Sequence, residues 1–284
     1  IHIEPQFKQP FMTGLDVLLE SDCSHLKGKK VGLITNQTGV TSKMVHNIDA
    51  FTKSENVDLK AIFSPEHGLF GSASAGEKIY NKTDSIYGIP LFSLYGNNKK
   101  PDKDMLKNLD ILVFDIQDIG IRSYTYISTM GLAMEAAQES GLEFMVLDRP
   151  NPLGLKKIEG NILSLSFKSF IGRYPIPYVH GLTSGELAKM INERGWLEGG
   201  KCNLKIIKMK NYDRNINYND LGLHWVPTSP HVPNANTPLY MVATGIVGEL
   251  GYFSNGVGYT APFMTLGAPW INANQLAEKM NSLG

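Results

Sequence analysis

The chain has 284 residues and a mass of 31.4 kDa, enough for one large domain or two modest ones that need no disulfide or metal to hold a core. Hydrophobic residues at 42% and charged residues at 19% argue against a disordered chain. The 27 basic and 27 acidic side chains cancel, so net charge gives no reason to expect nucleic acid as a partner. No apolar run reaches the length of a membrane span.

The cysteine content and the first residue bear on the cellular compartment. Cys23 and Cys202 cannot form a disulfide framework, and we interpret them as free or incidental thiols. The chain begins at Ile1 and not at a methionine, which a cleaved signal peptide, a tag or a fragment would each explain. These explanations stay open at this point, since low cysteine content fits an envelope protein as well as a cytoplasmic one.

The first half of the chain alternates short apolar runs with segments of helical length. This pattern predicts an α/β fold with a mostly parallel sheet covered by helices on both faces. The clearest helix covers residues 125–140, where apolar residues recur at spacings of three and four. The runs expected to form strands are Val31–Thr35, Leu59–Phe63, Pro90–Leu94, Ile111–Asp115 and Phe144–Asp148.

The second half has a different character, and we predict a domain boundary near residue 155. Residues 1–155 would form the α/β domain with the catalytic loops, and residues 156–284 a smaller α+β domain. A capping box, T-x-x-E, predicts a helix that begins near Ser184. Residues 204–209 are expected to form a strand, and residues 272–283 a helix. The long irregular stretch 211–238 is typical of a functional loop or lid.

Polar side chains follow each predicted strand at its carboxyl end. Because these ends of parallel strands lie along one edge of a sheet, where ligands bind, the polar clusters are expected to converge on one crevice. This inference locates a site without naming a reaction. The residues concerned are Asn36, Glu66, His67, Asp115, Gln117, Asp118, Arg149 and Asn151.

Glu66 and His67 lie in a tight turn, S-P-E-H-G. A carboxyl group close to apolar walls could keep its proton and deliver it to a substrate. The alternative is structural, with Glu66 capping a helix and His67 serving as a turn residue.

Asp115 and Asp118 flank Gln117 in the segment D-I-Q-D. Such oxygen ligands suit Mg²⁺ or Ca²⁺, but no EF-hand or zinc spacing is present and the seven histidines are scattered. We therefore predict no metal, and we interpret both aspartates as hydrogen-bonding residues. The absence of G-x-G-x-x-G, G-x-x-x-x-G-K-[ST] and G-x-S-x-G motifs predicts no dinucleotide, P-loop nucleotide or serine nucleophile, and thus no cofactor.

Two arginines and two tyrosines are further candidates for binding a substrate. Arg122 could clamp a carboxylate in a bidentate fork. Tyr124 and Tyr126 could stack on a sugar face, or pack at the start of a helix. Arg149 is either a partner of Asp148 or a second carboxylate clamp.

Seven long segments together resemble the exo-β-N-acetylmuramidases of the NamZ type, once catalogued as a domain of unknown function. The resemblance runs from about Gly14 to Ile271, nearly the whole chain, in the order of the family. The segments are LITNQTGV (33–40), FSPEHGLFG (63–71), SLYG (93–96), LVFDIQDIGIRSYTYISTM (112–130), VLDRPNPLG (146–154), HGLTSGELA (180–188) and GAPWI (267–271).

The resemblance implies a Rossmann-like α/β domain joined to a smaller domain, with a cleft between them. It implies a bacterial, often exported hydrolase that removes terminal N-acetylmuramic acid from the non-reducing end of peptidoglycan fragments. Glu66 is then the general acid, with His67 beside it. Substrate-binding roles fall to Asn36, Gln117, Arg122, Tyr124, Tyr126, Arg149, Asn151 and His231.

Glycoside hydrolysis usually needs a second carboxyl group across the scissile bond. Asp115 and Glu249 are the candidates, the latter at the E-G-T-N position of the family. The substrate's own acetamido group could also serve, and retention or inversion stays open. Arg122 or Arg149 could grip the lactyl carboxylate of N-acetylmuramic acid.

This chain departs from the family in two motifs. Where many members read E-G-T-N-x-S-E-G-R-G, it has Tyr252, Asn255 and Val257 in place of Asn, Glu and Arg. The family's S-P-N-x-P is present as S-P-H-V-P, with His231 for Asn. These changes support an alternative function, a catalytically silent envelope protein that binds an amino sugar or another acidic ligand. A weaker alternative is a metal-dependent hydrolase. The end at Gly284 also leads us to expect an incomplete second domain.

Overall fold

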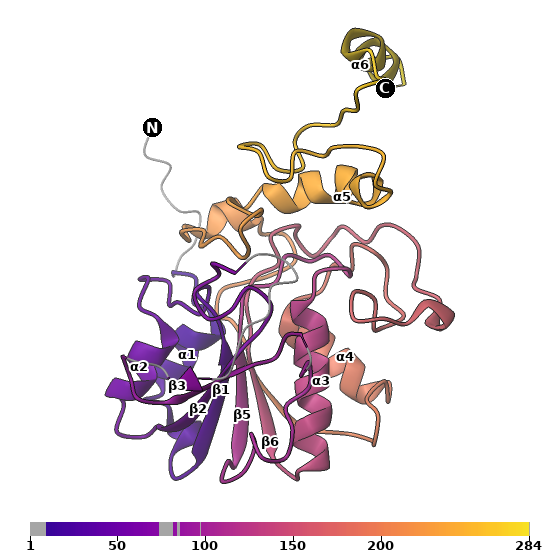
Figure 1. Ribbon diagram of the computed structural model, residues 1–284. Coiled ribbons are helices and arrows are strands. Elements are labelled where there is room, and N and C mark those ends of the chain that lie inside the picture. Colours follow the sequence, from indigo (N-terminus) through magenta and orange to yellow (C-terminus); the bar gives the residue numbers. More distant parts are fainter. Residues whose placement is uncertain (1–9, 74–81, 84–85, 97, 284) are drawn as a thin grey trace.

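A seven-stranded sheet organises this computed structural model, which describes residues 10–73, 82–83, 86–96 and 98–283 (Figure 1). Its strand order is β3-β4-β2-β1-β5-β6-β7. The strands are β1 (Lys30–Thr35), β2 (Asp58–Ser64), β3 (Lys82–Thr83), β4 (Pro90–Ser93), β5 (Ile111–Asp115), β6 (Glu143–Leu147) and β7 (Asn203–Ile207).

The pairing of the strands is that of a Rossmann-like fold. Short β3 lies antiparallel to β4, and all the other pairs are parallel. Counted in chain order without β3, the parallel strands follow the order 3-2-1-4-5-6, with the switch between β1 and β5. The predicted α/β fold is confirmed, and each predicted strand agrees with an observed one to within two residues.

Helices cover both faces of the sheet (Figure 1). Capping boxes begin α1, with Thr13 and Asp16, and α4, with Thr183 and Glu186 as predicted. The α-helices are α1 (Gly14–Glu20), α2 (Asn47–Lys53), α3 (Tyr126–Glu139), α4 (Ser184–Glu193), α5 (Thr237–Glu249) and α6 (Ala273–Asn281). The 3₁₀ helices are η1 (Ser24–Leu26), η2 (Leu165–Phe167) and η3 (Tyr218–Leu221).

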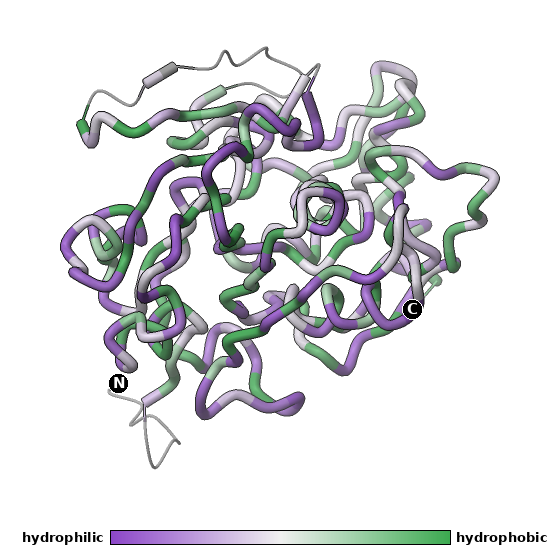
Figure 2. The backbone as a smooth tube through the Cα atoms, turned by 90° about the horizontal axis from the view of Figure 1, so that it is seen from below, coloured by the Kyte–Doolittle hydropathy of each residue, from purple (hydrophilic) through white to green (hydrophobic). Residues whose placement is uncertain are grey.

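The sheet has an apolar cluster on each face. One cluster packs α3 and α4 against the strands, and includes Phe114, Met130 and Leu187. The other packs α1 and α2, and includes Leu18 and Phe51. Figure 2 follows the alternation of hydrophobic and hydrophilic stretches along the backbone. Strand β5 is buried along its whole length, because it lies at the centre of the sheet with helices on both sides.

The predicted domain boundary near residue 155 does not coincide with an edge of the sheet. Helix α4 and strand β7 come after it, and β7 pairs in parallel with β6. Residues 184–207 thus extend the α/β layer. The segment after β7 then crosses the carboxyl edge of the sheet, and α5 lies above that edge (Figure 1).

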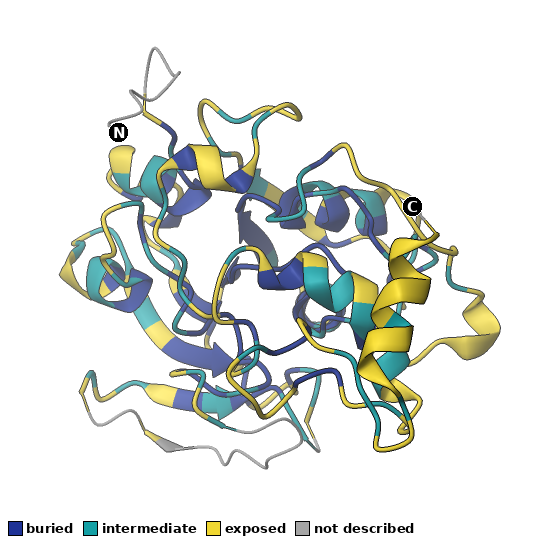
Figure 3. Cartoon of the chain, turned by 90° about the horizontal axis from the view of Figure 1, so that it is seen from above, coloured by how far each residue is buried: buried dark blue, intermediate teal, exposed yellow. Residues whose placement is uncertain are grey.

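The last helix, α6, stands apart from the rest of the chain in Figure 1 and is coloured as exposed in Figure 3. None of its residues is buried, and Met280 is 60% exposed. Among the described residues, no helix has the length and apolar character needed to cross a membrane.

Candidate functional site

The polar clusters that follow the strands do converge, and a loop covers them. The Gln37 amide nitrogen, after β1, donates to the Pro227 carbonyl at 2.8 Å. The Tyr124 hydroxyl, after β5, donates to the Thr228 hydroxyl oxygen at 2.9 Å. These two bonds hold the segment around residue 228 over the β1–β5 switch, where open α/β sheets bind ligands. Part of the irregular stretch 211–238 therefore lies at this edge.

Glu66 lies at this edge, directly after β2. Its side chain is buried, and its Oε2 accepts a hydrogen bond from the Thr125 hydroxyl at 2.8 Å. Its Oε1 has no hydrogen-bond partner among the described residues. The Gly68 amide donates to the Pro65 carbonyl and closes the turn. Glu66 caps no helix, so one carboxyl oxygen is oriented and the other is free to act on a ligand.

His67 occupies the left-handed region of the backbone map, at φ +70°. Its Nδ1 lies 2.8 Å from the Ala73 carbonyl oxygen, which can only accept. Nδ1 therefore carries the proton, and in the neutral ring Nε2 is an acceptor. The turn thus presents a carboxyl group and an imidazole acceptor from adjacent residues.

Tyr124 and Tyr126 form a buried pair, edge to face, with ring centroids 4.8 Å apart. The Tyr126 hydroxyl donates to the Thr228 carbonyl at 2.5 Å. Burial raises the pKa of Tyr124 to about 12 and that of Tyr126 well above its ordinary value. Tyr126 has no exposed surface on which a sugar could stack, which favours packing and anchoring of the 228 segment as its role.

Asp115 and Arg149 form a buried ion pair. Arg149 Nε donates to Asp115 Oδ1 at 2.6 Å, and the Asn47 amide donates to Asp115 Oδ2 at 2.8 Å. Asp115 is fully buried and Arg149 is 4% exposed. The charged partner of Arg149 is therefore Asp115. Asp148 accepts a hydrogen bond from the backbone amide of Arg149 and none from its guanidinium. With both oxygens engaged, Asp115 is poorly placed to serve as the second catalytic carboxylate.

Arg122 ties two loops together. Its Nη1 donates to the carbonyls of Asn161 and Ile176 at 2.6 and 2.7 Å, and its guanidinium lies 5.7 Å from the Tyr178 ring centroid. Burial lowers the pKa of Arg122. The contacts occupy one end of the guanidinium, so a carboxylate would meet only the remaining donors.

Three amide side chains predicted to bind substrate mainly hold the loops in place. Asn36 Oδ1 accepts from the Thr38 amide and hydroxyl, at 3.0 and 2.6 Å. Gln117 Nε2 donates to the Asp118 and Pro150 carbonyls, and Asn151 Nδ2 donates to the Leu182 carbonyl. Asn36 Nδ2 is an exception, since it is buried without a hydrogen-bond partner among the described residues.

Glu249 lies at the exposed end of α5 and approaches the site from above. Its charge raises the pKa of Tyr178, after the larger effect of burial, so the two side chains are near each other. The Tyr178 hydroxyl accepts from the Ser123 hydroxyl at 3.3 Å, and Ser123 is two residues before Thr125. Tyr178 thus connects the surroundings of Glu249 to the 122–125 segment, which Glu66 contacts through Thr125. His231 is half-buried in the loop that covers the edge.

Several residues of the site carry no sequence signal that we recognised. Thr125 orients Glu66, and Thr228 accepts hydrogen bonds from the hydroxyls of Tyr124 and Tyr126. Neither threonine belongs to a motif with obvious chemistry. Asp118 and His180 face each other at 3.8 Å, and Asp118 Oδ1 and His180 Nε2 lack hydrogen-bond partners in the described part of the chain. The H-G-L-T segment that contains His180 could have pointed to it.

The altered family motif is partly exposed. Tyr252 is 75% exposed and Val257 is 46% exposed, whereas Asn255 is buried against Gly248 in α5. Within the residues that the structure describes, no group of three or more metal-binding side chains comes together.

Comparison with known families identifies the family to which the chain belongs. A family model described as the N-terminal part of exo-β-N-acetylmuramidase NamZ matches residues 31–236, and the C-terminal model matches residues 239–284. The chain belongs to the NamZ family. The resemblance inferred from the seven segments is thereby confirmed.

Individual relatives of the NamZ family extend the comparison. Peptidoglycan β-N-acetylmuramidase NamZ of Bacillus subtilis (strain 168) is 46% identical over 276 residues, which cover 97% of this chain and 66% of that protein. A crystal structure of a DUF1343 family protein from Bacteroides fragilis NCTC 9343 has a TM-score of 0.91 and 49% identity, covering 96% of this chain and 69% of that one. A second such protein from the same strain has a TM-score of 0.81 and 35% identity, covering 93% and 69%.

We predict that Asp115→Asn destabilises the protein by about 3–5 kcal/mol, because the change leaves the Arg149 charge buried without its counter-ion. Chemical denaturation monitored by circular dichroism measures the change in the free energy of unfolding. Asp58→Asn is the matched control, because Asp58 pairs with Lys60 in solvent, and its loss should cost less than about 1 kcal/mol. Equal effects of the two variants would contradict the importance of the buried pair.

A second prediction concerns Asp148, whose buried carboxylate accepts hydrogen bonds from the Thr183 hydroxyl and the Gly185 amide, each at 2.8 Å. Burial outweighs these bonds and raises its pKa from 3.8 to about 6. Between these two values the folded protein binds more protons at this site than the unfolded chain, so its contribution to stability falls as pH rises. Denaturation of wild type and Asp148→Asn across this range should show that the fall in wild type is reduced in the variant. Parallel pH profiles would refute the assignment.

Proposed function

We propose that this protein is an exo-acting glycosidase that removes terminal N-acetylmuramic acid from the non-reducing end of peptidoglycan fragments. The proposal is supported by membership of the NamZ family and by the activity in the name of the Bacillus subtilis relative. The chain spans 66% of that relative's length. The observation that carries it is the position of Glu66 at the ligand-binding edge, with one oriented and one free carboxyl oxygen.

Glu66 is the proposed general acid. In glycoside hydrolysis the leaving-group oxygen must receive a proton as the glycosidic bond breaks. The Thr125 hydroxyl fixes Glu66 Oε2, so a proton on the unbonded Oε1 has a defined direction. His67, the next residue, has a ring acceptor available near the leaving sugar.

Glu249 is our candidate for the second catalytic group, in preference to Asp115. Asp115 is held by Arg149 and Asn47, whereas Glu249 has no hydrogen-bond partner among the described residues. Glu249 also comes from α5, and its charge acts on Tyr178, which contacts Ser123 close to Thr125. Two-carboxylate hydrolysis requires a second carboxyl group across the scissile bond, and Glu249 is our candidate for it.

The substrate class also bears on location and partners. Peptidoglycan lies outside the cytoplasmic membrane, and we propose that the protein acts there as an exported enzyme on peptidoglycan-derived saccharides.

The first test is Glu66→Gln, which keeps the Thr125 contact and removes the proton. Hydrolysis of a muramyl glycoside with a sugar leaving group should fall about 10²- to 10⁴-fold. A 4-nitrophenyl muramyl glycoside, whose leaving group needs little protonation, should lose much less. The matched control is Glu55→Gln, a change of an exposed carboxylate remote from the edge. An unchanged rate for Glu66→Gln would refute its role as the acid.

Glu249→Gln should behave in the opposite way. A nucleophile or base is needed whatever the leaving group, so both substrates should be hydrolysed more slowly, by a similar factor. Full activity of this variant would eliminate Glu249 and leave the substrate acetamido group as the nucleophile. If wild type binds muramyl saccharides without hydrolysing either glycoside, the alternative of a catalytically silent binding protein holds, as the changes at Tyr252, Asn255 and Val257 allow.

A further inference from the structure

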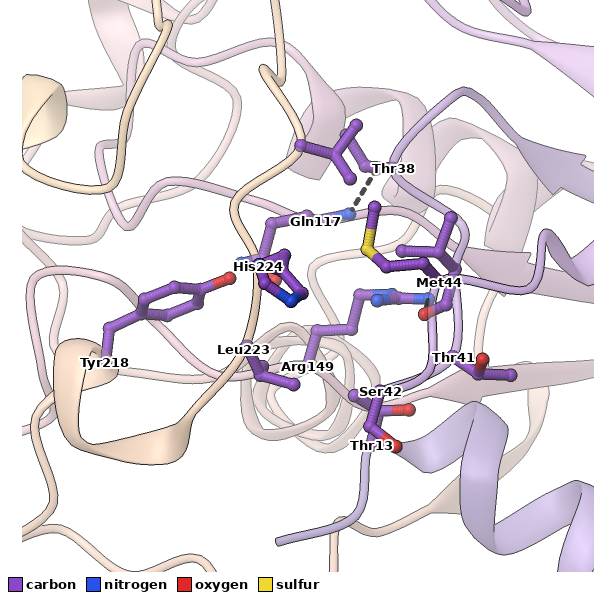
Figure 4. A pocket seen from close by; sticks show the side chains of 12 residues that line it. Thr13, Thr38, Thr41, Ser42, Met44, Gln117, Arg149, Tyr218, Leu223 and His224 are labelled. Atoms are coloured by element: carbon purple, nitrogen blue, oxygen red, sulfur yellow. Dashed lines mark hydrogen bonds between the residues drawn. The ribbon is translucent and has the colours of Figure 1, made fainter. Parts of the chain in front are cut away.

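A pocket lies beside the carboxyl edge (Figure 4), and Glu66 does not line it. Its walls come from the β1–α2 loop, the start of the β5–α3 loop, Arg149 after β6, and η3 with the residues that follow it. The space open to the centre of a water-sized molecule is about 20 Å³, which is room for a small group such as a carboxylate and not for a whole sugar. Its position suggests a binding subsite and not the place where a bond is broken.

Arg149 forms the charged wall of this pocket. Although only 4% exposed, its guanidinium is incompletely paired. Nε donates to Asp115 and Nη2 donates to the Val40 carbonyl at 2.9 Å. Nη1 has no hydrogen-bond partner among the described residues. Buried polar groups in native proteins are nearly always hydrogen-bonded, so unused donors bordering a cavity indicate a ligand or ordered water.

Tyr218 adds a second donor. It is 6% exposed, and its hydroxyl has no hydrogen-bond partner in the described part of the chain. Burial raises its pKa to about 12, while the nearby charge of Arg149 acts in the opposite direction. The phenol is therefore a neutral O–H donor at physiological pH. The hydroxyl points toward the ring of His224, which lies between Tyr218 and Arg149 in Figure 4.

The charges around the pocket restrict what it can accept. Asp115 already balances Arg149, and Asp16 accepts hydrogen bonds from the Ser42 amide and hydroxyl on the same wall. Two carboxylates thus lie near one guanidinium, which disfavours a dianion such as phosphate more than a monoanion. A singly charged carboxylate suits the pocket, because its two oxygens can accept from Nη1 of Arg149 and from the Tyr218 hydroxyl at once.

We propose that the pocket formed by Arg149, Tyr218 and His224 binds a carboxylate group. One source is the lactyl arm of an N-acetylmuramic acid residue, in which case the assignment rests on the proposed function. The other source is a free small carboxylate. Both present the same chemistry to Nη1 of Arg149 and to the Tyr218 hydroxyl.

Binding of sodium D-lactate to the whole protein tests the proposal, by calorimetry in buffers matched for ionic strength with sodium chloride. Tyr218→Phe removes one donor and keeps the ring packed on Trp225. It should weaken lactate binding about tenfold or more, as expected for a hydrogen bond to a charged group. Tyr212→Phe is the matched control, since Tyr212 is partly buried outside the pocket, and it should leave binding unchanged.

Arg149→Lys provides a second, independent change, because lysine keeps a cation beside Asp115 and removes the Nη1 donor. Loss of lactate binding in both variants, with circular dichroism spectra like that of wild type, supports the proposal. No detectable binding to wild type, or equal binding by wild type, Tyr218→Phe and Arg149→Lys, overturns it.

Competition distinguishes the two sources of the carboxylate. N-acetylmuramic acid should displace lactate if the lactyl arm occupies the pocket, while N-acetylglucosamine, which lacks that arm, should not. If neither sugar displaces lactate, the pocket is a separate site for small carboxylates. These binding measurements do not depend on hydrolysis. Failure of the pocket proposal can therefore be distinguished from failure of the glycosidase proposal.

Discussion

The buried pair of Arg149 and Asp115 is the constraint on which the carboxyl edge depends. It joins the ends of β5 and β6, neighbours in the sheet, and β5 borders the point between β1 and β5 where the strand order reverses. Asn47 brings α2 to the same carboxylate, and the Val40 carbonyl brings the β1–α2 loop to the same guanidinium. One ion pair thus sets the position of four segments. Removing two charges from water costs free energy, so the net contribution of the pair to stability is small. Its main effect is to fix the positions of these segments relative to one another.

The loop that covers the edge depends on a second set of contacts. Tyr124 and Tyr126 both donate to Thr228, and Gln37 donates to its neighbour Pro227. The tyrosines are rigid and buried, so the loop is anchored to α3 and not simply draped over the sheet. Glu66 is buried near these anchors, with its Oε2 oriented by Thr125, the residue between the two tyrosines.

Local patterns were sufficient to predict the fold but only part of the site. Apolar runs such as Ile111–Asp115 mark strands because both faces of a parallel sheet are buried, and the carboxyl-end rule then gathers Glu66, Asp115 and Arg149 at one edge. Helices α1 and α2 were missed because each has only seven residues, too few for a clear period of 3.6. Helix α5 lies in a stretch whose Pro, Gly and Thr content hides it.

Pairings between distant residues could not be predicted from one sequence. Nothing near Arg149 says that its partner is Asp115, 34 residues away, when Asp148 is adjacent. The link from Glu66 to Thr125 spans 59 residues and depends on how two loops meet. Tyr218 and His224 come from the irregular 211–238 stretch, where composition predicts a loop but not the direction of any side chain. Such contacts are products of the fold, and only the assembled edge reveals them.

The position of Thr125 affects both the stability of α3 and the orientation of Glu66. It is the residue that precedes the first turn of α3, yet its side chain makes no capping bond to that helix and turns instead to Glu66. A missing cap costs a helix about 0.5–2 kcal/mol. The longest helix of the described chain therefore begins with a local weakness at the residue that orients the proposed acid. A capping bond from Thr125 would stabilise the start of α3, but the same hydroxyl would then be unavailable to orient Glu66. The orientation of the proposed acid therefore comes at the expense of helix stability at this position.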